Sequence, residues 1–192
     1  RLRLFEPDTS RVYPSRRRLA ATPDGQYGTV MIRSDEFYMH RALEQAQRAF
    51  DSGEVPVGAV VVDAAGAVIG AGYNCPVEGK DPTAHAEVQA LRSAALALEN
   101  YRLDECSLYV TLEPCLMCAG AIIHARIRRV VYATAEPKGG MVESRANLFA
   151  QPWFNHRVEI DGGVLAAPAK RLLQQFFRER RQREPLPGPS SS

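Results

Sequence analysis

The stretch from residue 106 to residue 134 most constrains the fold, because its pattern is strand, helix and strand in direct succession. "CSLYVTLE" (106–113) is a short, nearly continuous apolar run, and "IRRVVYAT" (127–134) is another. Between them, "PCLMCAGAIIHAR" (114–126) begins with proline, which is favoured in the first turn of a helix. A strand–helix–strand order favours an α/β protein whose sheet is partly parallel and covered by helices.

The residues before this stretch predict two more helices and a hairpin. Ser34 is a suitable N-cap for an amphipathic helix that Gly53 would end. Two runs rich in β-branched residues flank the turn "DAAG" and predict two antiparallel strands. The expected elements are a helix over 34–53, strands over 55–63 and 67–74, a loop over 75–82 and a helix over 83–100.

The residues after it predict one more strand and a final helix. Residues 135–156 are loop-rich, with at most a short helix, and "RVEIDGGVL" suggests a strand and a turn. "PAKRLLQQFFRERRQRE" is an amphipathic helix pattern. A chain of 192 residues favours one domain. The expected organisation is an irregular basic arm over 1–33, a globular domain over 34–183 and a disordered tail over 184–192.

The charges are distributed unevenly along the chain. Residues 1–33 carry seven Arg against three acidic residues, and residues 170–184 carry six Lys or Arg against two. The segment between them, 34–169, carries eleven basic and seventeen acidic residues. Two basic ends on an acidic body suggest a polyanionic partner such as nucleic acid, although basic ends that only aid solubility explain the charges equally well. The chain has no run of 18 apolar residues, so no membrane span is predicted.

The cellular compartment is constrained by the N-terminal arm and the cysteines. A cytoplasmic location is the default expectation. The Arg-rich, acid-poor arm is also compatible with the remnant of a plastid or mitochondrial transit peptide, and a disordered extension is the simpler interpretation. Cys115 and Cys118 have the spacing of a metal or redox site in a reducing compartment. Cys75 and Cys106 have no partner at such spacing and are expected to be ordinary small buried residues.

A candidate metal site combines these two cysteines with a histidine. Cys115 and Cys118 can face the same side of a helix's first turn, where free N–H groups and the helix dipole favour the thiolate that binds metal. His85 lies in the first turn of its own predicted helix. If the two helices start at the carboxyl ends of neighbouring strands, the three side chains meet. Three protein ligands leave an open position for water, which is the catalytic arrangement of zinc.

Glu87 follows His85 by two residues and can point into the same pocket. There it could take a proton from the water and deliver it to a substrate. A glutamate in the first turn of a helix is most often a surface residue that suits the helix dipole. The joint pattern H-x-E…P-C-x-x-C is far more specific, because it is the signature of zinc nucleobase deaminases.

Several further segments extend the resemblance over roughly residues 35–182. "EVPVGAVVV", "GYNCP", "DPTAHAEVQALR", "TLEPCLMCAGAI", "FNHRVEI" and "FFRERR" resemble the tRNA-specific adenosine deaminases. The resemblance implies a three-layer α/β/α cytidine deaminase-like fold with a central mixed five-stranded sheet. It also implies a homodimer, one Zn2+ per subunit and a tRNA anticodon stem-loop as partner. The implied reaction is hydrolytic deamination of the wobble adenosine to inosine by zinc-activated water.

The resemblance also implies roles for individual residues. His85, Cys115 and Cys118 would be the zinc ligands, and Glu87 the proton shuttle. Asn74 matches the asparagine that hydrogen-bonds the flipped base, which suits an amide that both donates and accepts, although a turn-forming asparagine at a strand end is the simpler interpretation. The remaining residues expected around the base are Pro56, Val57, Ala86 and the backbone near Leu112, with Glu54 at the mouth of the pocket.

Contacts with the RNA strand are expected from the last helix and from scattered basic residues. Phe176, Phe177 and Arg178 match the family's "FFR", and aromatic and Arg side chains suit unstacked bases. One of the two rings is expected to be buried and the other exposed. Glu136 stands where the family has an aspartate that contacts a ribose hydroxyl, within a loop, 135–147, that departs from the family pattern. Plausible phosphate contacts are Arg126, Arg128, Arg129, Lys138 and Arg157.

Three other functions remain open on the sequence. A free-base or nucleotide deaminase, acting on guanine, cytosine or a riboflavin precursor, would share the zinc site but should lack a basic, aromatic last helix. A non-catalytic RNA-binding subunit of a deaminase complex would keep the zinc but typically lose the glutamate at position 87. A redox protein built on the two cysteines would leave His85 and Glu87 unexplained.

Overall fold

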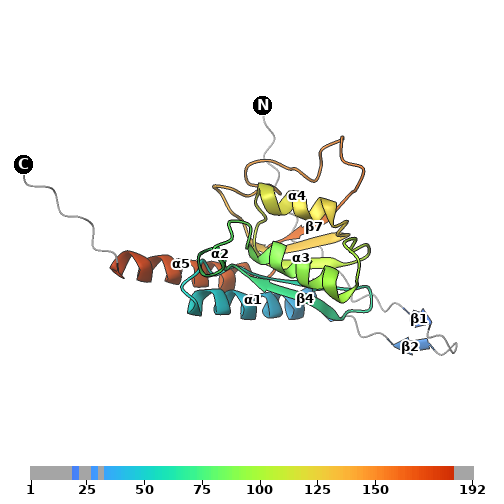
Figure 1. Ribbon diagram of the computed structural model, residues 1–192, viewed down its shortest axis with the longest axis horizontal. Helices are drawn as coiled ribbons and strands as arrows, with labels where there is room; N and C mark the ends of the chain where they lie inside the picture. The colour runs from blue at the N-terminus through green and yellow to red at the C-terminus, as the bar shows by residue number, and fades with distance from the viewer. Residues whose placement is uncertain (1–18, 22–26, 30–32, 184–192) are drawn as a thin grey trace, which may run out of the picture.

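A computed structural model describes residues 19–21, 27–29 and 33–183 and shows one five-stranded sheet with helices on both faces (Figure 1). In chain order the main elements are α1 (Asp35–Asp51), β3 (Gly58–Val62), β4 (Val68–Tyr73), α2 (Pro76–Gly79), α3 (Ala86–Ala97), β5 (Ser107–Leu112), α4 (Leu116–His124), β6 (Arg129–Thr134), β7 (Glu159–Gly162) and α5 (Ala166–Arg183). Helices α3 and α4 pack on one face of the sheet, and α1 and α5 pack on the other. The expected three-layer α/β/α architecture is confirmed.

The sheet is mixed, and its strand order places the ends of several strands together. The order is β4-β3-β5-β6-β7. Strand β3 runs antiparallel to both β4 and β5, whereas β5, β6 and β7 are parallel. All strands except β3 therefore point the same way, and β4, β5 and β6 finish at one border of the sheet. We call this border, marked by Tyr73, Leu112 and Thr134, the site edge.

The strand order corrects one expectation from the sequence. The segments that follow β4 and β5 carry His85 and Cys115, and these strands were expected to be neighbours. Strand β3 lies between them instead. The carboxyl ends of β4 and β5 still share the site edge, because two successive antiparallel pairings restore the original strand direction.

Helix α3 lies very close to β4 because the facing residues are small. A Cβ atom on Gly72 would collide with the backbone of α3 at Ala86 and Ala90, and one on Gly70 would collide at Ala90 and Ala94. Side chains at these two strand positions would therefore push the helix away from the sheet. The alternation of glycine along β4 sets the distance between the sheet and the start of α3.

Most predicted boundaries agree with the structure to within a few residues. Ser34 caps α1, with its Oγ accepting from the Phe37 N–H at 3.3 Å. The expected loop over 75–82 contains the one-turn helix α2. Helices α3 and α4 begin slightly later than predicted, so that His85 and Cys115 are N-cap residues with extended backbone. Within the described residues, the segment 135–156 contains no helix, as expected.

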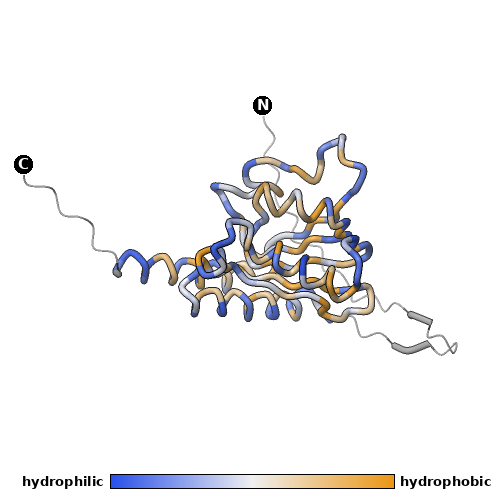
Figure 2. Tube along the Cα trace, viewed as in Figure 1, coloured by the Kyte–Doolittle hydropathy of each residue, from blue (hydrophilic) through white to orange (hydrophobic). Residues whose placement is uncertain are grey.

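The two ends of the chain are described only in part. In the expected irregular arm, β1 (Leu19–Ala21) and β2 (Tyr27–Thr29) pair as a short antiparallel ladder. The rest of residues 1–32 and the expected tail at 184–192 lie outside the described residues. Figure 2 shows the apolar residues concentrated in the sheet and a hydrophilic final part of α5. Over the part of the chain that is described, no helix is long and apolar enough to span a membrane.

Candidate metal centre and catalytic site

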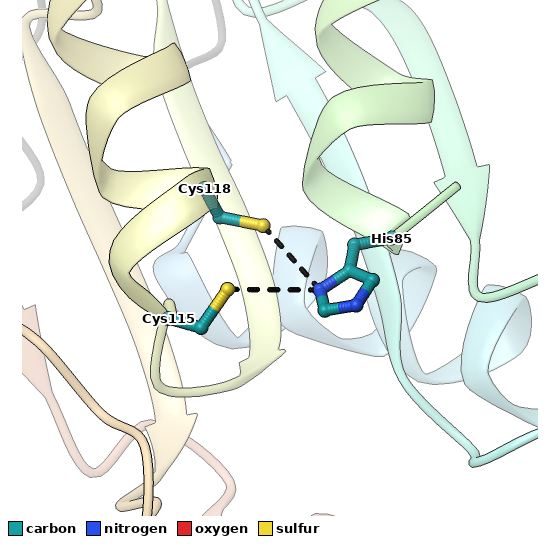
Figure 3. A group of neighbouring side chains, drawn as sticks. All are labelled: His85, Cys115 and Cys118. Atoms are coloured by element: carbon teal, nitrogen blue, oxygen red, sulfur yellow. Dashed lines mark hydrogen bonds between the residues drawn. The ribbon is translucent and has the colours of Figure 1, made fainter. Parts of the chain in front are cut away.

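Two helix starts at the site edge bring a histidine and two cysteines together (Figure 3). His85 precedes α3, Cys115 precedes α4, and Cys118 lies in the first turn of α4. Their nitrogen and sulfur atoms all lie within 4.8 Å of one another. Within the described residues, no other His, Cys, Asp or Glu belongs to this group.

The spacing of these donor atoms fits a tetrahedral zinc ion. The Nδ1 atom of His85 lies 3.7 Å from Sγ of Cys115 and 3.6 Å from Sγ of Cys118. Zinc bonds of about 2.0–2.1 Å to nitrogen and about 2.3 Å to sulfur, at the tetrahedral angle, place the two donor atoms about 3.6 Å apart. The three side chains can therefore occupy three corners of the tetrahedron and leave the fourth for water or substrate.

The local electrostatics favour a thiolate at Cys115. A hydrogen bond from the Cys118 thiol lowers the pKa of Cys115 to about 4, assisted by His85 and opposed by burial. The hydrogen bond between His85 and Cys115 raises the pKa of His85, while burial opposes this by disfavouring the charged imidazolium. The thiolate is the form of cysteine that binds metal, so the chain itself prepares one anionic ligand.

Glu87 is buried beside the metal-binding group instead of lying on the surface. Its side chain belongs to the first turn of α3, and the residue is only 4% exposed. Burial is the main reason that its pKa is raised to about 7, with a smaller opposing effect from a hydrogen bond with Cys118. A carboxyl group that titrates near neutral pH can both accept and return a proton, which is the property of a general acid–base group.

Asn74 ties the end of β4 to the start of α3. Its Oδ1 accepts from the Ala86 N–H at 2.8 Å, and its own backbone N–H donates to the Val57 carbonyl at 3.0 Å. These bonds hold Asn74 between His85 and the buried Pro56–Val57 segment. Because Oδ1 accepts this backbone bond, the Nδ2 amino group is the part of the side chain available for donating to a substrate acceptor.

Glu54 caps the start of helix α2 with its carboxylate. It is buried, and its Oε1 accepts from the backbone N–H groups of Val77 and Glu78, both at 2.8 Å. A carboxylate at a helix start satisfies N–H groups that have no partner within the helix. We therefore assign Glu54 a capping role, and its expected place at the mouth of the base pocket stays a prediction.

Glu136 lies on the loop that follows β6, at the site edge. Its Oε1 accepts from the Lys138 N–H at 2.9 Å, while its backbone N–H donates to Glu113 at the same distance.

Glu113 is a buried residue that the sequence does not single out as functional. Its only signal is an acidic residue placed directly after an apolar strand and directly before the Pro-Cys pair.

The last helix presents one aromatic ring to the core and one to solvent, as expected. Phe176 is 6% exposed and its ring packs edge-on against Phe50, with 5.8 Å between ring centroids. Phe177 is 43% exposed, and Arg178 is exposed beside it. Figure 1 shows the second half of α5 extending past the layered body, on the side where α2 lies.

Two of the arginines expected to contact phosphate lie at the wrong border of the sheet. Arg128 and Arg129 stand at the start of β6, opposite the site edge. Both nitrogen ends of the Arg129 guanidinium are paired, with Asp35 and with Asp161, each at 2.7 Å. Arg128 pairs with Glu159 at 3.2 Å. This placement argues against a role for either arginine in RNA contact and indicates that they hold α1, β6 and β7 together.

The remaining expected phosphate contacts divide into two groups. Arg126 and Arg157 donate to backbone carbonyls of the loop that covers α4, at Asn155 and Gln151. Lys138 is exposed on the loop at the site edge. Among these three, Lys138 belongs to the loop that contacts Cys115 through Gly140.

A surface hollow of about 410 Å³ lies elsewhere on the protein. It is lined by residues of α1 and of the β3–β4 hairpin, including Phe37, Arg41 and Val68. These elements belong to the α1 face of the sheet, away from α4. The hollow contains none of the metal-binding side chains, so it is not the catalytic pocket.

Comparisons with known proteins agree with this geometry. Residues 32–134 match the cytidine and deoxycytidylate deaminase zinc-binding region, which identifies the metal as zinc. The tRNA-specific adenosine deaminase of Haemophilus influenzae is 48% identical over 152 residues, covering 79% of this chain and 88% of that protein. A solved structure from work on A-to-I editing by tRNA:A34 deaminases at the wobble position of transfer RNA is 44% identical, with a TM-score of 0.68, covering 71% of this chain and 98% of that one. A guanine deaminase from Nitrosomonas europaea is 26% identical, with a TM-score of 0.63, covering 85% of this chain and 88% of that one.

Proposed function

The chain belongs to the family of tRNA-specific adenosine deaminases, and we propose that it converts the wobble adenosine of a tRNA anticodon to inosine. The single observation that carries this proposal is the buried Glu87 beside a three-ligand zinc site. A structural zinc site has four protein ligands and needs no neighbouring acid–base group. The arrangement found here is the one required for hydrolysis.

The chain's own residues supply the proton transfers and hold the substrate. Zinc, when bound by His85, Cys115 and Cys118, lowers the pKa of a water in the open position to about 7. Glu87 would take one proton from the attacking water and pass it to N1 of the purine ring, and would later move the second water proton to the departing amino group. The water oxygen becomes bonded to C6, the C6–N6 bond breaks, and ammonia leaves. Asn74 would orient the base by donating from Nδ2 to an acceptor on the purine edge.

Exposed aromatic and cationic side chains support RNA over a free base as substrate. Phe177 offers an exposed ring for stacking, and Arg178 and Lys138 offer cationic groups. The similarity that extends over most of the chain also favours a tRNA enzyme: a tRNA-specific adenosine deaminase is 48% identical over 79% of this chain, whereas one guanine deaminase is 26% identical over 85% of it and another is 44% identical over only 54%. A wobble nucleotide must leave its stack to reach a buried Glu87, which requires contacts to the flanking nucleotides.

We also propose that the chain forms a homodimer through the outer face of α4. Leu116 is 58% exposed at the start of this helix. One turn later, a Cβ on Gly120 would meet no atom within 4 Å, so the helix surface is open for close approach by another chain. Light scattering should give a mass of twice the chain for the wild type and a monomer mass for Leu116→Glu. A monomeric wild type at micromolar concentration would contradict the dimer.

The cytoplasm is the compartment we propose, because it keeps thiols reduced. Cys115 and Cys118 must remain free thiols to bind zinc, and all four cysteines are free in the structure. Reducing compartments favour metal binding over disulfide formation at such a cysteine pair.

The proposed reaction is tested with a synthetic anticodon stem-loop. Purified protein with zinc should convert a wobble adenosine to inosine, detected by nucleoside mass spectrometry. The same stem-loop with adenosine moved to the neighbouring anticodon position serves as the substrate control. Free guanine and free cytosine are tested in parallel. Deamination of either free base together with no inosine in the RNA would establish the alternative, a free-base deaminase.

A further inference from the structure

A single buried carboxylate gathers the loop that follows β6. Glu113 is 2% exposed and lies directly after β5. Its two oxygens accept from four backbone N–H groups at 2.8–3.1 Å and from the hydroxyl of Ser144. The backbone donors are Glu136, Val142, Glu143 and Ser144. One side chain therefore organises both ends of the segment 136–144, which we call the edge loop.

The edge loop also touches the segment that carries the first zinc-binding cysteine. Gly140 forms an isolated antiparallel bridge with Cys115, and the Met141 N–H donates to the Pro114 carbonyl at 2.9 Å. A Cβ on Gly140 would collide with the Glu113 carboxyl group. The loop is thus packed directly against the backbone of residues 113–115, and no side chain fits between them.

A second contact fixes the far end of the edge loop to the sheet. The Tyr132 hydroxyl donates to the Glu143 carboxylate at 2.6 Å. Tyr132 is a buried residue of β6, so this bond anchors Glu143 independently of Glu113. Glu143 and Ser144 both belong to the stretch "MVESRAN" at residues 141–147.

The edge loop carries two polar side chains, Glu136 and Lys138, a few residues before its contact with Cys115. Glu136 is half-buried and Lys138 is exposed, and both precede the bridge between Gly140 and Cys115. Their positions relative to zinc are set by how the loop is held. A carboxylate that accepts five hydrogen bonds in a buried site is a stiff anchor, because each donor would be left without a partner if the loop moved.

We propose that Glu113 is a positioning residue that holds the edge loop in register with the zinc ligand Cys115, so that Glu136 and Lys138 meet the RNA backbone beside the flipped base. This inference rests on the proposed function for its substrate. Glu113 acts through the loop, and it does not touch the reacting atoms. Its loss should weaken binding of the RNA strand, while Glu87 and the metal ligands continue to act on substrate that is bound.

Glu113→Gln is the main test, because it keeps the shape of the side chain and replaces one carboxylate oxygen by an amino group that cannot accept hydrogen bonds from the edge loop. Ser144→Ala removes one donor to Glu113 and serves as a milder variant if Glu113→Gln folds poorly. Glu44→Gln, an exposed substitution on α1, is the matched control. Each variant is assayed for zinc content, for KM and kcat on the stem-loop, and for amide hydrogen exchange.

Glu113→Gln is expected to raise KM about tenfold or more while kcat changes far less, since an interaction that acts equally on bound substrate and transition state affects KM. Ser144→Ala should move KM in the same direction by a smaller factor. Hydrogen exchange at the amides of Val142, Glu143 and Ser144 should accelerate in Glu113→Gln. Zinc content should remain at the wild-type level, and Glu44→Gln should match the wild type throughout.

Two results would overturn the proposal. One is a folded, zinc-loaded Glu113→Gln whose KM equals that of the wild type. The other is unchanged exchange at the three edge-loop amides, which would mean that Glu113 does not hold the loop. Because the exchange measurement needs no substrate, it separates failure of this inference from failure of the proposed RNA substrate, which would show as absence of inosine with the wild-type protein.

Discussion

Replacing Glu87 by Gln is expected to reduce inosine formation at least about 10³-fold while zinc remains bound, because general acid–base groups contribute about 10²–10⁴-fold and Glu87 serves several proton transfers. The amide keeps the size of the buried side chain and removes its ability to take a proton. The loss should appear in kcat, measured by single-turnover conversion of the stem-loop, with little change in RNA affinity.

Glu99→Gln provides the matched control for this substitution. Glu99 lies just beyond the far end of α3 and is exposed, so the same chemical change there should leave the rate unaltered. Zinc content of both variants is measured by atomic emission. A fully active Glu87→Gln variant with zinc in place would refute the assigned role of this carboxyl group.

Cys118→Ala is expected to remove zinc and activity together. Cys118 is fully buried and supplies one of three protein ligands, so its loss leaves two side chains for a metal that normally has at least three. Zinc content should fall far below that of the wild type, and inosine formation should fall below detection. The melting temperature should also fall, since a metal that binds only the folded chain stabilises it.

A second buried cysteine gives the control for Cys118. Cys106 is equally enclosed but stands just before β5, at the opposite border of the sheet. Cys106→Ala should therefore keep its zinc and its activity, apart from a modest loss of stability. If Cys118→Ala retained the full zinc content, the assignment of the three ligands would be wrong.

The sequence was sufficient to predict the ligands and the main elements because these depend on local patterns. The apolar runs of β5 and β6 and the helical spacing of α1 are short-range signals. The group formed by His85, Cys115 and Cys118 follows from two motifs, each of which lies at a helix start.

The features that were missed depend on contacts between distant segments. The strand inserted between β4 and β5 belongs to a hairpin that pairs with β5 through residues 45–51 positions apart in sequence. Arg129 resembled a phosphate ligand because its partners, Asp35 and Asp161, are distant in sequence. Glu54 and Glu113 are buried carboxylates whose oxygens accept hydrogen bonds mainly from backbone N–H groups. Every residue type except proline has such a group, so these partners cannot be recognised from the sequence.

The separation between the zinc ligands and the edge loop has an evolutionary consequence. The ligands stand on helix starts that the sheet fixes, while the loop between β6 and β7 is held by a few side-chain bonds that a small number of substitutions can rearrange. Lineages can therefore alter which molecules are admitted without rebuilding the hydrolytic apparatus. A guanine deaminase with a TM-score of 0.63 to this chain fits such a history of retained chemistry and divergent recognition.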